Sequence, residues 1–306
     1  MKVCFIGLGS IARRHITNLK SIMGDDISID VLRSGNGNSI DEEFAANISR
    51  VVFSDEELDE HYDALFITNP TSKHYETLKR HINRSNHFFI EKPVFETGEE
   101  DISGLINEPK VFYVACPLRY TNVIQYLKKN IDFTKVYSMR CISSSYLPDW
   151  RPGTDYRKTY SAHKNLGGGV SIDLIHEWDY IHYLIGSPEC VKSIISKKSG
   201  LEIDSDDIAI YIAEYKDKTV ELHLDYFGRK TIRNVELYTA DDTISADLVN
   251  QKINYLKDNR TIDLSQERNE YQIRELQHFI DIINGKAVCD NDLNEACKIL
   301  RITRGY

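Results

Sequence analysis

The stretch KVCFIGLGSIA, residues 2–12, decides the fold of this chain. A short apolar run leads directly into the pattern Gly-x-Gly-x-x-Ala, and residues 13–23 then have the pattern of a helix. A strand, a tight turn and a helix N-terminus form an anion cradle, because unpaired backbone N–H groups and the helix dipole point at the same place. Gly7 permits the turn, Gly9 admits a pyrophosphate and Ala12 keeps the helix close to the strand. We therefore predict a dinucleotide site rather than an ordinary strand-turn-helix, with contacts from Gly7, Gly9, Ser10, Ile11 and Ala12.

The composition indicates a globular protein of about two domains. The chain has 306 residues, of which 41% are hydrophobic and 28% charged. A net charge of −9 argues against general binding of nucleic acid, which needs a basic face. No apolar run approaches the roughly 20 residues of a membrane span, and the N-terminus is a core strand rather than a signal peptide. We therefore expect a cytoplasmic protein without nucleic-acid or membrane partners.

The six cysteines are scattered and form no Cys-x-x-Cys pair. Paired spacings are the usual signal for metal sites, and disulfides belong mainly to secreted proteins. We therefore predict no metal site and reduced thiols.

The first part of the chain alternates strands with helices. Strands are predicted at residues 2–6, 27–32, 50–53, 63–67, 87–90 and 111–115. Helices are predicted at residues 11–23, 41–47, 55–60, 72–84 and 98–105. Alternation with short loops is typical of a doubly wound parallel sheet with helices on both faces. We therefore predict an α/β fold in which residues 1–117 form a Rossmann domain that binds NAD(P).

The pattern changes after about residue 118. Helices are predicted at 120–130 and 170–185, with a strand at 135–145 between them. Residues 190–256 alternate apolar and polar side chains in runs separated by turns, as in an antiparallel sheet with one wet face. Helices at 268–284 and 291–303 close the chain. We therefore predict that residues 118–306 form an α+β domain with an open, mainly antiparallel sheet, for substrate binding and oligomerisation.

The end of the second strand bears on the choice between NAD and NADP. An NAD site usually has an acidic residue there, which accepts hydrogen bonds from the ribose 2′-hydroxyl. If the strand ends at Leu32, Arg33 and Ser34 meet the ribose, and a guanidinium with a hydroxyl suits a 2′-phosphate. Asp30 is the competing acidic residue, two positions earlier, and a merely solvated Arg33 is the other alternative. We favour NADP over NAD.

Polar residues follow the fourth and fifth strands, whose carboxyl ends share one edge of the predicted sheet. The fourth strand leads into Thr68, Asn69, Pro70 and, further on, His74. The fifth leads into Glu91-Lys92-Pro93. Ligands of open parallel sheets bind at this edge, where a lysine could polarise a carbonyl or move a proton. A surface Glu-Lys pair is the structural alternative.

A loop in the second half gathers aromatic rings and cations. Its rings suit stacking on a sugar, and its guanidinium groups suit phosphate. The predicted substrate contacts in this loop are Trp150, Arg151, Tyr156, Arg157 and Tyr160. We therefore favour a phosphorylated or nucleotide-linked sugar, with an ordinary surface loop as the alternative.

Three glycines, residues 167–169, precede the helix predicted at 170–185. They could let the backbone come close to a ligand. Asp173, His176 and Glu177 are spaced to share one face of that helix. A carboxylate beside a histidine can orient it for acid–base catalysis, whereas a dipole-favoured Asp and a satisfied His are the structural alternative.

Together, the glycine motif, Asn69-Pro70-Thr71, His74 and Glu91-Lys92-Pro93 resemble the Gfo/Idh/MocA oxidoreductase family over nearly the whole chain. Residues 114–120 look like the crossing between its two domains, and Arg119 there is a further predicted substrate contact. The resemblance implies a Rossmann domain joined to an open-sheet domain, with Lys92 as the catalytic lysine. It also implies that Asn69, Pro70 and His74 border the nicotinamide.

The helix motif departs from the commonest family pattern, which places His four residues after Asp. Here Glu177 holds that place and His176 precedes it, as in a branch with Pro-Asp-Trp-Arg-Pro and Asp-Leu-x-His-Glu-x-Asp-Tyr motifs. His176 is our first choice of acid–base, oriented by Asp173, and Glu177 is the alternative. The branch is associated with surface-polysaccharide and nonulosonic-acid sugar pathways.

The resemblance implies hydride transfer between NAD(P) and a hydroxyl or keto carbon of a sugar derivative. The alternative enzyme is a redox-neutral epimerase or lyase that retains its cofactor. A non-catalytic sensor is a third class, but it would be expected to lose Lys92 or the His176 region. The open sheet predicts a homodimer or homotetramer if its exposed face is apolar.

Overall fold

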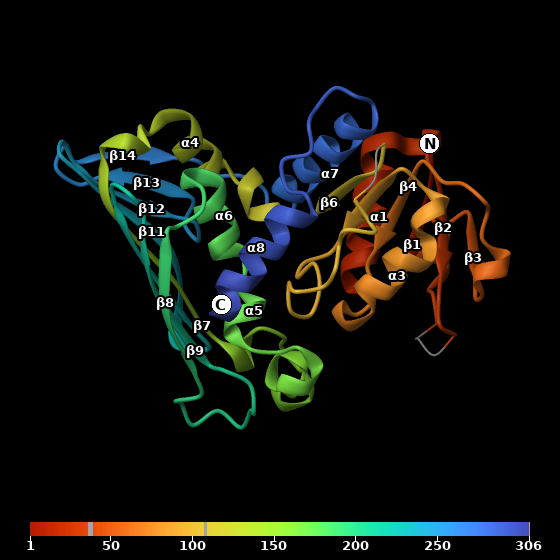
Figure 1. The fold of residues 1–306 in the computed structure, drawn as a ribbon, viewed down its shortest axis with the longest axis horizontal. Helices are drawn as coiled ribbons and strands as arrows, with labels where there is room; N and C mark the ends of the chain where they lie inside the picture. Colours follow the sequence, from red (N-terminus) through yellow and green to blue (C-terminus); the bar gives the residue numbers. More distant parts are fainter. Residues whose placement is uncertain (36–38, 107–108, 306) are drawn as a thin grey trace. The chain divides into compact units, whose positions relative to one another are not determined.

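The computed structural model describes residues 1–35, 39–106 and 109–305. The chain divides into two compact units (Figure 1). The first unit contains Met1–Cys116 and Asn269–Lys298, and the second contains Pro117–Arg268 and Ile299–Tyr306.

The first unit is built on a six-stranded parallel sheet with the order β3-β2-β1-β4-β5-β6. Its strands are β1 (Lys2–Ile6), β2 (Ser28–Leu32), β3 (Arg50–Val52), β4 (Ala64–Ile67), β5 (His87–Ile90) and β6 (Val111–Val114). Each predicted strand is found to within one residue at either end. The predicted doubly wound parallel sheet is confirmed.

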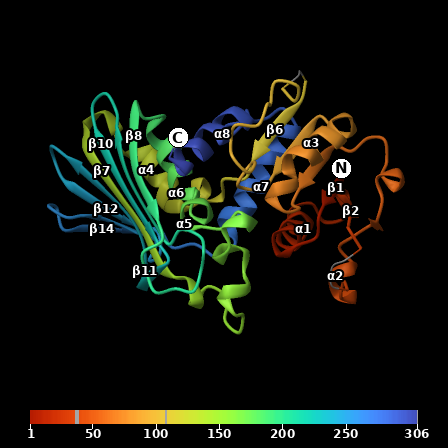
Figure 2. The same ribbon diagram turned by 60° about the horizontal axis from the view of Figure 1, so that its bottom comes forward.

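Helices cover both faces of this sheet. From β1 the chain passes through α1 (Ser10–Met23) to β2, and from β4 it passes in the other direction through α3 (His74–His81) to β5. Right-handed crossovers therefore place α1 and α3 on opposite faces, as Figure 2 shows. Strand β4 is buried along its whole length, as a strand covered on both faces should be.

Two of the predicted helices in this unit are wrong, and a third is short. Residues 98–105 form turns, because the Glu100 carboxylate accepts from the N–H groups of Thr97 and Gly98 and replaces the helical ladder. Residues 55–60 contain only a single 3-10 turn, Asp55–Glu57. The helix predicted at 41–47 is reduced to α2 (Glu42–Ala45).

The C-terminal part of the chain returns to the first unit, which the single predicted boundary at 117/118 did not anticipate. Helix α7 (Glu270–Ile283) lies beside the strands of this unit in Figure 1. Its Phe279 ring meets Phe66 and Phe89 edge-on, with centroids 5.6 and 5.3 Å away. Its Glu275 accepts from the N–H of Cys116 at 2.5 Å. The boundary back to the second unit falls within α8 (Leu293–Arg304).

The second unit carries an eight-stranded sheet with the order β14-β13-β12-β11-β7-β10-β9-β8. Its strands are β7 (Val136–Tyr146), β8 (Cys190–Ser196), β9 (Ile208–Glu214), β10 (Thr219–Asp225), β11 (Phe227–Thr239), β12 (Thr243–Asp247), β13 (Lys252–Tyr255) and β14 (Arg260–Asp263). All pairs are antiparallel except β7 with β10. The prediction of an open, mainly antiparallel sheet is confirmed.

One face of this sheet is packed and the other is exposed. Val220, Leu222 and Leu224 of β10 are buried, whereas the alternating Glu221 and His223 point to the other face. Helix α4 (Asn122–Asn130) also belongs to this unit, with its N-terminus capped by the Thr121 side chain.

The helix predicted at 170–185 is interrupted. It forms α5 (Val170–Asp173) and α6 (His176–Ile185), because Leu174 leaves the helical region at φ −98° and ψ 28°. The two pieces do not share one continuous face.

No described helix is long and apolar enough to cross a membrane. All six cysteines are free thiols.

Candidate functional site

The glycine loop after β1 fits a dinucleotide phosphate. Gly7 has a φ of +97°, and a Cβ there would lie 2.8 Å from the backbone of Asn69, so only glycine is accommodated. A Cβ on Gly9 would meet nothing within 4 Å. Among the described residues, no side chain caps α1 at its N-cap Gly9, and its first turn carries no acidic residue. The backbone donors of a 14-residue helix are therefore left available for an anion.

Asn69, just beyond β4, adds a second open position beside this loop. Its Nδ2 donates to Thr77 Oγ1 at 2.8 Å, but its Oδ1 is buried and has no partner in the described part of the chain. Buried polar atoms are nearly always hydrogen-bonded in native proteins, so an unpaired acceptor here fits a hydroxyl or amide of a bound cofactor. Thr68 holds the loop from the other side, because its hydroxyl donates to Gly7 O at 2.9 Å.

His74 is buried and fixes the segment that follows Asn69 and Pro70. Its Nε2 lies 2.9 Å from Asn69 O, and its Nδ1 lies 3.0 Å from Val94 O. Burial lowers the pKa of His74, although the two backbone carbonyls and the Glu91 charge act in the opposite direction. The imidazole thus joins the loop after β4 to the loop after β5.

Glu91 and Lys92 follow β5 at the same edge. Glu91 Oε1 lies 2.5 Å from Nε2 of His15, on α1. Burial would raise the pKa of Glu91, but the hydrogen bond and charge of His15, with the charges of Lys92 and His74, lower it overall. Sequence reasoning missed His15, although a signal was present. His15 interrupts the otherwise apolar stripe of Ala12, Ile16 and Leu19 on α1.

The end of β2 separates the two candidate ribose contacts. The strand ends at Leu32, so Arg33 and the exposed Ser34 are the first residues beyond it. The N–H of Arg33 donates to Val52 O at 3.0 Å. The sequence predicts that Arg33 and Ser34 contact the ribose if β2 ends at Leu32, and the strand does end there.

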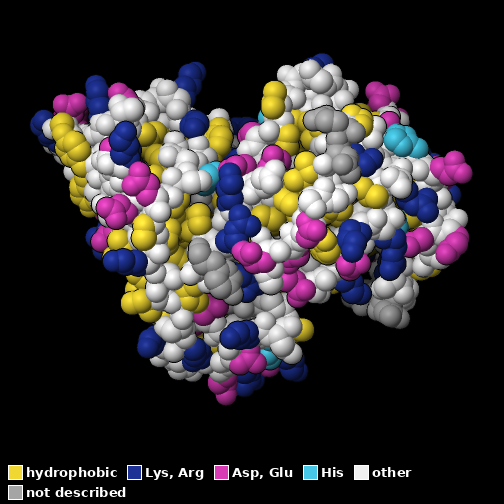
Figure 3. Space-filling model, viewed as in Figure 1, with side chains coloured by type: hydrophobic (Ala, Val, Ile, Leu, Met, Phe, Trp, Pro, Cys, Tyr) yellow, Lys and Arg dark blue, Asp and Glu magenta, His cyan; other side chains and the backbone are white. Residues whose placement is uncertain are grey.

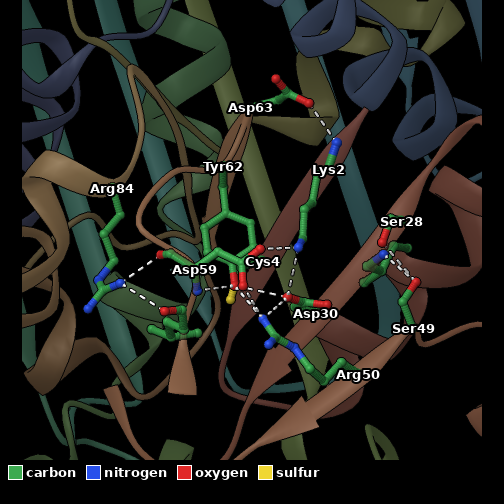
Figure 4. Close-up of polar contacts among 12 residues, drawn as sticks. Lys2, Cys4, Ser28, Asp30, Ser49, Arg50, Asp59, Tyr62, Asp63 and Arg84 are labelled. Carbon is green, nitrogen blue, oxygen red and sulfur yellow. Dashed lines mark hydrogen bonds and ion pairs between the residues drawn. The ribbon is translucent and has the colours of Figure 1, made fainter. Parts of the chain in front are cut away.

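Asp30 has a different environment (Figure 4). It is buried, accepts from Arg50 at 2.6 Å and from the Tyr62 hydroxyl at 2.9 Å, and lies 3.8 Å from the Lys2 ammonium. Arg50 also pairs with Asp59 at 2.7 Å. We call Lys2, Asp30, Arg50, Asp59 and Tyr62 the amino-end cluster, because all of them except Asp30, the middle residue of β2, lie at or before the amino ends of their strands. The Asp30 carboxylate is thus already hydrogen-bonded to protein groups.

In the second unit, the phenol groups of Tyr160 and Tyr226 interact with the Asp173 carboxylate. Tyr226 donates to its Oδ2 at 2.6 Å, and the Tyr160 hydroxyl bonds to the same side chain. Burial, followed by the charge of Asp173, raises the pKa of Tyr160. Sequence reasoning missed Tyr226, which lies 53 residues beyond Asp173.

Two residues of the predicted substrate loop, Trp150 and Arg151, contact these tyrosines. Trp150 meets Tyr226 edge-on with centroids 5.2 Å apart, and the Arg151 guanidinium lies 5.6 Å from the centre of the Tyr160 ring. Arg151 has no carboxylate partner among the described residues. A small pocket is lined by Leu147, Pro148, Trp150, Arg151, Thr154, Tyr156, Thr159 and Ser161.

Two of the three glycines before α5, Gly168 and Gly169, have a structural explanation. A Cβ on Gly168 would lie 2.0 Å from Tyr160 O, and a Cβ on Gly169 would lie 2.1 Å from the Asp206 carboxylate. Asp206 also accepts from the N–H of Ser171 at 2.9 Å. The close approach that requires glycine is therefore made by the protein itself.

Asp173 and Glu177 have different surroundings, in place of the predicted common face. Glu177 is fully buried, and its Oε1 lies 2.7 Å from Nε of Arg233, on β11. Burial raises the pKa of Glu177 against the opposing charge of Arg233. His176 is partly exposed at the start of α6.

Two of the predicted substrate cations are already paired. Arg119 is buried and forms a bidentate contact with Asp179, with N–O distances of 3.0 and 2.7 Å. Arg157 pairs with Asp155 at 2.9 Å and Glu202 at 3.0 Å. Arg151 is therefore the better candidate for a substrate anion.

Comparison with known proteins finds an oxidoreductase family model that matches the Rossmann part of the chain. Residues 1–115 match the Gfo/Idh/MocA family model, described as an oxidoreductase family with an NAD-binding Rossmann fold. The myo-inositol 2-dehydrogenase of Thermotoga maritima is 24% identical over 304 residues, covering 92% of this chain and 83% of that protein. The uncharacterized oxidoreductase YrbE of Bacillus subtilis is 23% identical over 192 residues, covering 60% of this chain. The chain thus spans about half, 53%, of the length of YrbE.

Two solved structures share the fold. Levoglucosan dehydrogenase in complex with NADH superposes with a TM-score of 0.83 at 17% identity, covering 100% of this chain and 95% of that one. UDP-N-acetylglucosamine 3-dehydrogenase GnnA from Acidithiobacillus ferrooxidans gives 0.80 at 20% identity, covering 99% and 95%. The family resemblance noted in the motifs is thus matched over residues 1–115, and the fold is shared over the whole chain.

Proposed function

We propose that this chain is a member of the Gfo/Idh/MocA oxidoreductase family and transfers hydride between NAD(P) and a hydroxyl or keto carbon of a sugar derivative. The observation that carries the proposal is the open cradle of the first unit. There, the uncapped N-terminus of α1 and the unpaired Asn69 Oδ1 lie at the sheet edge that also bears Lys92. A bound nicotinamide supplies the hydride chemistry, and the protein supplies placement and electrostatics.

Hydride transfer is accompanied by transfer of a proton to or from the substrate oxygen, and each unit contains candidate residues for this step. Lys92 is proposed to polarise the substrate oxygen, with His176 as acid–base and Asp173 as its orienting group. Glu177 is the alternative acid–base, but its ion pair with Arg233 makes it the weaker candidate. The phenol groups on Asp173 support a second role for that carboxylate, which is to order Tyr160 and Tyr226.

The proposed substrate is a phosphorylated or nucleotide-linked sugar. Trp150 and Tyr160 offer ring surfaces, and Arg151 offers a guanidinium beside them. Relatives and structural neighbours are named for myo-inositol, levoglucosan and UDP-N-acetylglucosamine, and only the last carries phosphate. Arg151 is the feature of this chain that favours the charged substrate class.

We propose NADP as the preferred cofactor. Arg33 and Ser34 lie directly after β2, where the adenosine ribose of such folds binds. Asp30, the residue that would favour NAD, is held by Arg50 and Tyr62.

We also propose a homodimer or homotetramer formed through the exposed face of the eight-stranded sheet. Hydrophobic side chains lie over this sheet in Figure 3. Ile194 and Ile212 are 62% and 52% exposed, and Ile194 pairs in register with Ile210. A patch of isoleucines on a flat sheet can pair with its own copy about a twofold axis. Light scattering would show the oligomer, and Ile212→Asp would dissociate it.

The first experiment is a titration of tryptophan fluorescence with NADPH and NADH, on protein first checked for co-purified nicotinamide by its absorbance. Reversible binding, followed by turnover with nucleotide-linked and simple sugars, supports the dehydrogenase. Nicotinamide that survives purification, with interconversion of sugars and no net oxidation, supports the redox-neutral epimerase or lyase instead. Absence of binding by either dinucleotide contradicts both enzymes.

A further inference from the structure

His15 is a buried histidine at the inner side of α1, and its ring is held on several sides. The ring meets Phe89 edge-on at 5.0 Å and Phe66 at 6.5 Å between centroids. The side chain is 2% exposed, and Nε2 lies 2.5 Å from the Glu91 carboxylate. The ring is thus oriented by two neighbouring strands and one short polar contact.

Glu91 links this ring to the residue proposed to act on the substrate. It is the first residue beyond β5, and its N–H donates to Ile67 O at 3.0 Å, which extends the ladder with β4. Lys92 follows immediately in the chain. Whatever holds the Glu91 side chain therefore also holds the backbone from which Lys92 projects.

The charged groups around Glu91 come from three elements. His15 faces it from α1, His74 from α3, and Lys92 is its neighbour in the chain. The combined effect of these groups keeps the pKa of Glu91 below its ordinary value despite burial. An ionised carboxylate only accepts hydrogen bonds, so Nε2 of His15 is the donor.

We propose that His15 is a positioning residue. By donating to Glu91 it fixes the segment that presents Lys92, and it couples this segment to the helix whose N-terminus forms the cofactor cradle. The proposal rests on the proposed function, because it takes Lys92 as the group that acts on the substrate oxygen.

The test compares His15→Phe with a matched histidine. His81 is also buried, lies 3.5 Å from Asp55 and has an unpaired Nδ1 among the described residues, but Asp55 precedes no catalytic candidate. We expect His15→Phe to lower kcat about 10- to 100-fold, with KM for the cofactor within about threefold. His81→Phe should leave kcat within about twofold, and His15→Gln, which restores a donor, should recover part of the loss.

The pH profile separates positioning from loss of structure. Without its donor, buried Glu91 takes up a proton more readily, so the acid limb of kcat/KM should move to higher pH in His15→Phe. In His15→Phe/Glu91→Gln that shift should disappear, because the amide does not titrate. An unmoved limb, with kcat no lower than in His81→Phe, overturns the proposal.

A readout that needs no turnover keeps this test distinct from the proposed function. Lys92 is acetylated at low reagent concentration, and its labelling rate relative to Lys129 is followed by mass spectrometry across pH. We expect a relative rate change of at least about threefold in His15→Phe and none in His81→Phe. If the enzyme shows no turnover but the labelling changes, the positioning role stands and the proposed function fails. If the labelling of Lys92 is the same in all variants, the proposal is overturned.

Discussion

The two ends of the six-stranded sheet differ in how completely their polar groups are satisfied. At the amino end, Asp30, Arg50 and Tyr62 bond to one another, and Asp59 and Lys2 complete the charges of the amino-end cluster. At the carboxyl end, α1 begins without a side-chain cap among the described residues, and Asn69 Oδ1 is buried without a partner there. Both ends contain charged residues and lie in the same unit.

The difference separates scaffold from site. A saturated network orders strands and leaves nothing for a ligand, whereas unpaired donors and acceptors carry a cost that a ligand can remove. Burial of Cys4 beside the amino-end cluster, followed by the charge of Asp30, raises the pKa of its thiol to about 12, so that thiol is inert. Charge content alone would not have distinguished the two ends.

The largest expected effect is at the carboxyl end. Lys92→Ala should lower turnover about 10²- to 10⁴-fold, the usual contribution of a group that polarises or transfers a proton. Dinucleotide affinity, measured by fluorescence, should stay within about threefold, because the cradle is formed by backbone groups of the loop and α1. Turnover close to that of the wild type would remove Lys92 from the mechanism.

Replacement of Arg33 should change cofactor choice. Arg33→Ala should weaken NADPH binding about 10- to 100-fold, since a charge-assisted contact with phosphate contributes about 1.5–3 kcal/mol. NADH binding should change little, and Arg33→Lys should be intermediate because it keeps the charge without the planar fork. Equal effects on both dinucleotides would place Arg33 away from the 2′-position.

Replacement of Asp30 should affect stability and leave cofactor choice unchanged. Asp30→Ala removes the acceptor of Arg50 and Tyr62 and should lower the free energy of unfolding by about 2 kcal/mol. The effect is at the low end for a buried pair because the Arg50 side chain is 41% exposed and keeps Asp59. Urea unfolding and the ratio of NADPH to NADH affinity are both measured for this variant. A changed ratio would mean that Asp30 contacts the ribose after all.

The smallest expected effect is a pH dependence from His74. Burial lowers its pKa below 6.5, so the unfolded chain binds the proton first as the pH falls. Wild-type stability should therefore decrease more steeply than that of His74→Gln below about pH 6.5, whereas the difference between the two should be independent of pH near about pH 7.5. Urea unfolding at several pH values measures the difference, and parallel curves would mean that His74 titrates normally.

Sequence patterns predicted the sheets well because burial on both faces leaves apolar runs bounded by turn signals, as in β4 and β5. They failed at 98–105, where Glu100 satisfies backbone N–H groups in place of a helix. They also failed at Leu174, whose dihedral angles end α5 within an otherwise helical pattern.

The positions of Asn69, Glu91 and Lys92 beyond the carboxyl ends of β4 and β5 were predicted, because these residues follow apolar runs. Contacts between residues distant in sequence were missed, because spacing carries no information about contacts such as that of Tyr226 with Asp173. Arg119 and Arg157 were assigned to substrate by charge alone, while the carboxylates that pair with them lie elsewhere in the chain or beside them. His15 was detectable as a polar interruption of an apolar stripe.

The return of α7 to the first unit has a consequence for biosynthesis. The core around Phe66 and Phe89 includes Phe279, so the ribosome has made most of the chain before this core can close. Domains usually fold as they emerge from the ribosome, the N-terminal one first. The first unit cannot complete its core until α7 has been synthesised, so its aromatic surface stays exposed until then. A chain stopped after its first six strands would therefore be a poor dinucleotide binder and a good client for chaperones and proteases.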